Sequence, residues 1–207
     1  MMKTFANIVS FLFHPLLMVT YGVLLAMMFT YLSIYPDKAK LLIIVGALLV
    51  TCIIPALFIL LIIRTGGASD IELTDRRERV LPYLVIIASI LLYTYYMYRM
   101  MMPNWLLLIL IGGIIALLIA LCVNFVWKIS AHSIGIGGLM GGVMGVCRIH
   151  LMNPFWAFML LFLIAGLVCS SRIYLKRHTP MQTYAGFGLG FICTFTASLI
   201  SYIYLFI

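Results

Sequence analysis

The chain has 207 residues, of which 66% are hydrophobic and only 9% are charged. An ordinary soluble domain has roughly 25% charged residues, so this composition excludes a soluble fold and requires that most of the chain face lipid or other helices. The net charge of +8 would suit a nucleic-acid partner. The basic residues, however, lie singly or in short clusters at the ends of apolar runs, where lipid headgroups lie, so we expect no nucleic acid among the partners.

Uncharged runs of about 20 residues, the length that crosses a bilayer core of about 30 Å, recur along the whole chain. They predict seven membrane spans, at residues 5–31, 41–63, 80–98, 105–127, 133–147, 154–171 and 183–207. The first run contains His14-Pro15, and proline removes a helix hydrogen bond, so we expect a kinked or interfacial piece before the true span. The predicted fold class is therefore all-α, a polytopic transmembrane helix bundle of six or seven spans. No repeat and no linker is visible, so residues 1–207 are expected to form a single integral membrane domain.

The fifth run is short and rich in glycine. Several of its glycines are spaced as GxxxG, which gives a helix face without side chains on which a neighbouring helix packs closely. That neighbour is either a helix of the same chain or the same helix of a second copy in a homodimer. The glycines of the fifth run are Gly135, Gly137, Gly138, Gly141, Gly142 and Gly145.

The five cysteines all lie inside apolar runs without a CxxC pair, as is typical of small buried hydrophobes.

The connections between spans sort onto two sides of the membrane if the chain crosses once per span. One side receives the N-terminus and the connections at residues 64–79, 128–132 and 172–182. These three connections are the most polar and carry histidines or arginines. We therefore expect a functional site to be assembled from them at one face.

The connection at residues 64–79 holds four of the five acids of the protein and ends at Arg79, close to Pro82. One interpretation is a solvated loop whose acids and arginines pair at little net gain. The other is a phosphate-binding loop, because Arg79 lies at the mouth of a span. Asp75 and Arg76 are further candidates in that loop.

The second connection places Lys128, Ser130 and His132 within five residues, directly before the glycine-rich run. Unpaired backbone N–H groups and the helix dipole favour negative charge at a helix N-terminus, so this stretch is a candidate anion site. The alternative is a hydrogen-bonded structural histidine.

The third connection contains Arg172, Lys176, Arg177 and His178. If a helix resumes near His178, that residue and Gln182 are four apart and share a face. Arginine binds phosphate oxygens bidentately, and a histidine with a pKa near neutral acts as a nucleophile or proton donor. The basic cluster is also what the positive-inside rule produces at a cytoplasmic end.

The order of these clusters resembles the motifs K-x6-R-P, P-S-G-H and S-R-x5-H-x3-D of the phosphatidic acid phosphatase type 2 superfamily. Ser171-Arg172 and His178 match the third motif, in which Gln182 stands where the family has aspartate. Ser130-Ala131-His132 is similar to the second motif, and Arg79 with Pro82 to the first.

The resemblance implies a divergent membrane lipid phosphatase or phosphotransferase that works through a phosphohistidine, without a metal or cofactor. His178 would be the nucleophile, His132 would protonate the leaving alkoxide as general acid, and Gln182 would orient His178 without offsetting its charge. The substrate would be a lipid phosphate of the phosphatidyl, polyprenyl or lipid A type, in the bacterial cytoplasmic (inner) membrane. The phosphate-binding residues would be Arg79, Lys128, Ser130, Arg172, Asp75 and Arg76.

Two other functions stay open. A metal-dependent prenyl- or alcohol-phosphate transferase would use Asp70, Glu72 and Asp75 around Mg²⁺. A non-catalytic lipid-headgroup binder or lipid transporter would retain the anion pocket without turnover, and the neutral Gln182 favours it. The orientation is open too, because nine of the thirteen lysines and arginines lie on the candidate-site side, yet several of them are candidate phosphate ligands rather than topology signals.

Overall fold

The computed structural model describes residues 2–65 and 77–204, and within these two ranges the chain is helical with no strand. Short turns of 3-10 or π-helix join or interrupt the α-helices at Pro15–Leu17, Tyr31–Ile34, Leu48–Ile53 and Arg77–Arg79. The α-helices are α1 (Met2–Leu12), α2 (Met18–Phe29), α3 (Asp37–Ala47), α4 (Ile54–Arg64), α5 (Val80–Arg99), α6 (Asn104–Asn124), α7 (Ala131–Ile149), α8 (Phe155–Tyr174) and α9 (Pro180–Tyr204).

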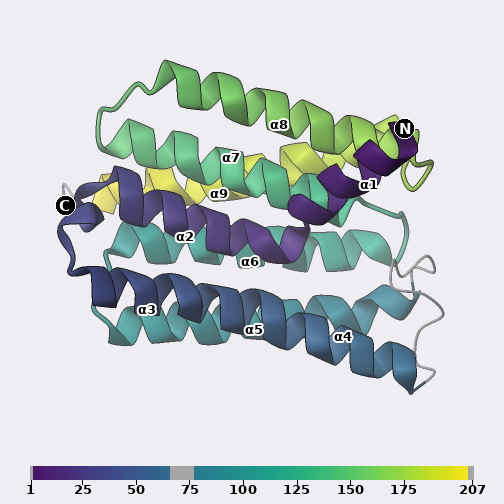
Figure 1. The fold of residues 1–207 in the computed structure, drawn as a ribbon, viewed down its shortest axis with the longest axis horizontal. Helices are drawn as coiled ribbons and strands as arrows, with labels where there is room; N and C mark the ends of the chain where they lie inside the picture. Colours follow the sequence, from purple (N-terminus) through teal and green to yellow (C-terminus); the bar gives the residue numbers. More distant parts are fainter. Residues whose placement is uncertain (1, 66–76, 205–207) are drawn as a thin grey trace.

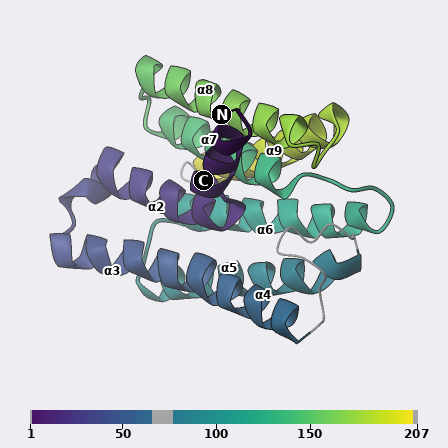
Figure 2. The ribbon, with the colours of Figure 1, turned by 45° about the vertical axis from the view of Figure 1, so that its right-hand side comes forward.

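The described parts of the chain contain six segments that are long and apolar enough to cross a membrane, so the protein is an integral membrane protein with an all-helical fold. The helices run side by side in one bundle, with α3, α4 and α5 on one side of α6 and with α7 and α8 on the other (Figures 1 and 2). The six segments are Met2–Phe29, Asp37–Arg64, Val80–Arg99, Asn104–Asn124, Phe155–Tyr174 and Pro180–Ile203.

The glycine-rich helix α7 accounts for the difference between six apolar segments and seven predicted spans. Its 19 residues run alongside the other helices, but its glycines and the polar His132 and Arg148 near its ends reduce its apolar character (Figure 1). Because α7 packs against α2, α6, α8 and α9, it needs fewer apolar side chains than a helix that faces lipid. Within the described residues the bundle therefore contains six apolar spans and one largely enclosed helix.

The first span is broken at His14-Pro15, as predicted. Helix α1 ends at Leu12, and His14 has extended backbone angles (φ −65°, ψ 139°) before a 3-10 turn leads into α2. Pro15 has no N–H and its ring is incompatible with a continuous helix, so the carbonyls of the last turn of α1 lose their helical partners. The Tyr21 hydroxyl donates to one of them, the Leu12 carbonyl, at 2.8 Å.

The glycine face of α7 packs against α9 of the same chain. A Cβ added at Gly137 or Gly141 would collide with the backbone of α9, and one added at Gly190 of α9 would collide with the backbone of α7. The Thr194 hydroxyl of α9 donates to the Gly138 carbonyl at 2.9 Å, which ties the two helices at their closest approach. This face is therefore occupied internally, and a homodimer through α7 would need a different face of the helix.

The polar connections meet at one end of the bundle, as the alternation of spans predicts. The N-terminus and the α6–α7 and α8–α9 connections lie at the right-hand end of Figure 1, and the turn before α5 lies at the same end. Arg79 Nη1 donates to the Ile129 carbonyl at 3.4 Å, and the Ser130 N–H donates to the Gln182 carbonyl at 3.4 Å. These two bonds join all three connections.

Candidate functional site

A tight turn at the end of α8 positions His178. The N–H of Lys176 donates to the Ile173 carbonyl at 2.9 Å, and the N–H of Arg177 donates to the Arg172 carbonyl at 3.1 Å. This is the Schellman pattern, and Lys176 adopts the left-handed conformation that it requires (φ 56°). The chain thus reverses directly after α8, and His178 lies against the bundle with 8% of its surface exposed.

Gln182 orients the ring of His178. Its Oε1 accepts a hydrogen bond from the Thr179 N–H at 3.2 Å and lies 3.2 Å from His178 Nδ1. The Gln182 N–H in turn donates to the Thr179 hydroxyl at 3.3 Å, so the side chains cap the start of α9 reciprocally. Because Oε1 only accepts, Nδ1 of His178 carries the hydrogen and Nε2 keeps its lone pair. The predicted pairing of these two residues is present.

The environment of His178 keeps its ring neutral. Burial is the main cause that lowers its pKa, and the charges of Arg79, Lys128 and Arg172 lower it further, whereas the hydrogen bond with Gln182 raises it; the resulting pKa is about 3. A neutral imidazole with a free Nε2 lone pair is the nucleophilic form of histidine.

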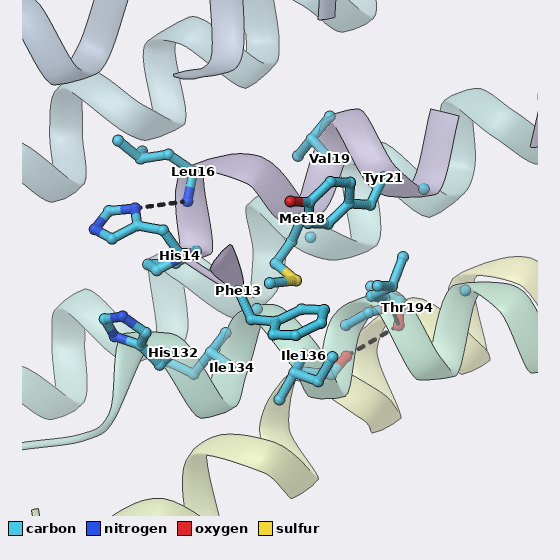
Figure 3. A pocket seen from close by; sticks show the side chains of 18 of the residues that line it. Phe13, His14, Leu16, Met18, Val19, Tyr21, His132, Ile134, Ile136 and Thr194 are labelled. Atoms are coloured by element: carbon cyan, nitrogen blue, oxygen red, sulfur yellow. Dashed lines mark hydrogen bonds between the residues drawn. The ribbon is translucent and has the colours of Figure 1, made fainter. Parts of the chain in front are cut away.

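His132 lies in the first turn of α7 and contacts the broken first span. Its Nε2 is 3.2 Å from the Ser10 carbonyl, which only accepts, so Nε2 carries a hydrogen. Its ring meets that of His14 edge to face, with 5.2 Å between the ring centroids. Figure 3 shows the two histidines side by side at the cavity.

Two arginines are buried at the same end of the bundle. Arg79 is 8% exposed and Arg172 is 7% exposed, which is unusual for charged side chains. Arg172 acts electrostatically on His132 and His178 as well as on His14. The candidate nucleophile and the candidate acid therefore lie within the field of one buried guanidinium group.

These residues line one end of a cavity of about 1360 Å³. From there the cavity continues between apolar side chains of α2, α6, α7 and α8, and it reaches Phe29, Trp105 and Pro154 near the opposite end of the bundle. An anion with a long apolar tail fits such a lining, because the cationic end binds the head and the apolar walls cover the tail. The basic residues at its polar end are Lys3, His14, Arg79, His132, Arg172, Arg177 and His178.

Some predicted site residues lie elsewhere. The Ser130 side chain is fully buried away from the cavity lining; its hydroxyl accepts from the N–H of Ser133 at 3.4 Å and from the Ser133 hydroxyl at 3.0 Å, so it caps α7. Lys128 and Gln182 are also absent from the cavity lining and act on the site through His178. Asp75 and Arg76 lie outside the described residues.

His14 is the site residue that the sequence patterns did not identify. The dipeptide His14-Pro15 predicts a helix break, but a histidine inside a long apolar run is itself a signal of function in a membrane protein. The structure places it in the cavity lining beside His132.

No family model, curated protein or solved structure matches this chain. The resemblance to the phosphatidic acid phosphatase type 2 superfamily therefore stays a prediction from motifs, and the geometry of the site carries the functional argument.

The low pKa of His178 predicts that acid destabilises the protein. An unfolded histidine takes up a proton near its ordinary pKa of 6.5, whereas folded His178 resists protonation down to about pH 3. Unfolding at a pH between these two values therefore takes up a proton at His178. The contribution of His178 to the free energy of unfolding is complete above pH 6.5 and is lost as the pH falls. For one group this loss is at most about 1.4 kcal/mol per pH unit. Melting curves in detergent from pH 7 to pH 4 should show a smaller decline for His178→Asn than for the parent. If the melting temperatures of the two proteins fell equally between pH 7 and pH 4, the low pKa of His178 would be contradicted.

Proposed function

We propose that this protein is an integral membrane phosphatase or phosphotransferase that acts on a lipid phosphate through a phosphohistidine at His178. One observation carries the proposal: a neutral histidine, oriented by Gln182, lies beside the buried Arg79 and Arg172 at the polar end of a large apolar cavity. This combination supplies a nucleophile, an anion site and a place for a hydrocarbon tail.

The geometry supports a two-step reaction. Nε2 of His178 attacks phosphorus, a P–N bond forms, and the bond from phosphorus to the lipid oxygen breaks. Arg79 and Arg172 hold the phosphoryl oxygens, where negative charge spreads in the transition state. Water, or an acceptor hydroxyl in a phosphotransferase, then attacks the phosphohistidine and gives its proton to the His132 ring, the P–N bond breaks, and neutral His178 is restored.

His132 is the candidate proton donor to the leaving lipid oxygen. Its Nε2–H is bonded to the Ser10 carbonyl, so the proton for catalysis must be a second one, at Nδ1. A bound phosphate dianion beside the ring favours this cationic form, because opposite charges at short range stabilise each other. The acid is therefore expected to be charged only while substrate is bound.

The cavity favours a lipid over a soluble phosphate. Each buried methylene of a tail contributes about 0.8 kcal/mol. Phosphatidyl, polyprenyl and lipid A-type phosphates all combine a phosphate head with such tails. Together with the sequence motifs, this supports a divergent member of the phosphatidic acid phosphatase type 2 superfamily, and the bacterial cytoplasmic membrane is what that resemblance implies.

The decisive experiment measures phosphate release from these three classes of lipid phosphate by purified protein in detergent, with and without EDTA. The parent is expected to be active in EDTA, and His178→Ala is expected to lose activity by on the order of a thousandfold or more. His150→Ala is the matched control, because His150 lies beside Trp105 at the other end of the bundle. A His178→Ala variant as fast as the parent would refute the proposal.

The same assay separates the alternatives. A non-catalytic headgroup binder or lipid transporter is favoured by Gln182, since a neutral amide orients His178 but does not stabilise its cationic form; it predicts binding of lipid phosphates with no turnover. A Mg²⁺-dependent transferase predicts loss of activity in EDTA. Its candidate ligands Asp70, Glu72 and Asp75 lie outside the described residues.

A further inference from the structure

The break in the first span creates a binding feature as well as a bend. In a continuous helix the N–H of His14 would donate to the Ser10 carbonyl, but here it donates to Phe11 at 3.3 Å. The Ser10 carbonyl is released from the helix and lies 3.2 Å from His132 Nε2. The break at Pro15 thus makes the Ser10 carbonyl available to His132 and places the ring of His14 beside the ring of His132.

The hydrogen bonds of His14 determine which ring nitrogen faces a ligand as a donor. Its Nδ1 accepts from the Leu16 N–H at 3.4 Å, and in the neutral ring the hydrogen is therefore on Nε2 (Figure 3). Among the described residues this is the only hydrogen bond of the ring, so Nε2–H is the donor that remains for a ligand.

His14 shares its surroundings with the proposed phosphate site. It lines the same cavity as Arg172 and His178, it contacts the His132 ring edge to face, and the charge of Arg172 acts on it. An N–H donor on His14 beside a buried guanidinium group is suited to an anion, because a phosphate oxygen accepts from both kinds of group.

We propose that His14 is a third histidine of the phosphate site and that its Nε2–H donates a hydrogen bond to a phosphoryl oxygen of the bound lipid phosphate. The inference rests on the proposed function for the identity of the ligand. With His14 as a ligand, the broken first span becomes part of the substrate-binding site. Residues 10–16 then line this site together with the three polar connections.

The test uses a substitution that separates the two roles of His14. His14→Asn keeps a side-chain oxygen that can accept from the Leu16 N–H, since asparagine is a favoured residue at such caps, but it removes the Nε2–H donor. His14→Ala removes both. Binding of inorganic phosphate to the purified proteins is measured by ³¹P NMR titration, and melting temperature reports the fold. His150→Asn at the opposite end of the bundle is the matched control.

For His14→Asn we expect the phosphate dissociation constant to rise about tenfold or more, with the melting temperature of the parent. His14→Ala should bind equally weakly and melt at a lower temperature, and His150→Asn should bind like the parent. The inference is overturned if His14→Asn binds phosphate like the parent, or if the parent binds none. If phosphate binding depends on His14 but the parent releases no phosphate from any lipid phosphate, the proposed function fails and the anion site stands.

Discussion

Replacement of Arg172 by alanine is expected to lower kcat/KM for a lipid phosphate by on the order of a thousandfold. Arg172 is 7% exposed, lines the polar end of the cavity, and acts electrostatically on His132 and His178. A fixed charge in a site that excludes water stabilises a developing phosphoryl charge far more than a solvated one. The backbone bond that Arg172 accepts from Arg177 does not use the side chain, so the turn that places His178 is expected to survive.

Two companion variants make this result specific. Arg172→Lys keeps the charge but loses the planar fork that binds two oxygens, so its activity is expected to lie between those of the parent and Arg172→Ala. Lys176→Gly removes an exposed charge from the same connection while glycine adopts the left-handed conformation of Lys176 without strain, and it should retain activity. Equal losses in Arg172→Ala and Lys176→Gly would show that the net charge of this end matters rather than the buried guanidinium group.

Gly141→Leu is expected to destabilise the protein by several kcal/mol, beyond the usual 1–3 kcal/mol or so for overpacking. Even a single Cβ at Gly141 would collide with the Phe191 carbonyl, and backbone does not move aside as a flexible side chain does. Separation of α7 from α9 would also pull the Ser130 N–H away from the Gln182 carbonyl, the bond that joins two of the polar connections. Activity should therefore fall together with stability.

Gly188→Leu is the matched control for Gly141→Leu, because Gly188 lies on α9 and a Cβ there has no neighbour within 4 Å beyond the adjoining backbone of its own helix. Thermal unfolding of both variants in detergent should leave Gly188→Leu near the parent and Gly141→Leu far below it. If the two variants melted alike, the close approach of α7 and α9 would not be a source of stability.

Features that depend on local order along the chain were predictable from the sequence. The lengths of the apolar runs predicted the bundle, and the alternation of spans predicted that the polar connections meet at one end, because each crossing reverses the side. The pairing of His178 with Gln182 followed from their separation of four residues at a helix start. The break at His14-Pro15 followed from the missing N–H of proline.

The partners that residues find across the bundle were decided only by the tertiary structure. Ser130 had the spacing of a phosphate ligand, yet its hydroxyl caps α7, because the start of that helix is buried against Gln182. His14 had no motif around it, yet it lies at the cavity beside His132. The hydrophobic periodicity and the residue spacing of the sequence describe one helix at a time, whereas a binding site depends on which faces of different helices pack together. Among the described helices the closest approach is that of α7 to α9, where glycine lets two backbones meet.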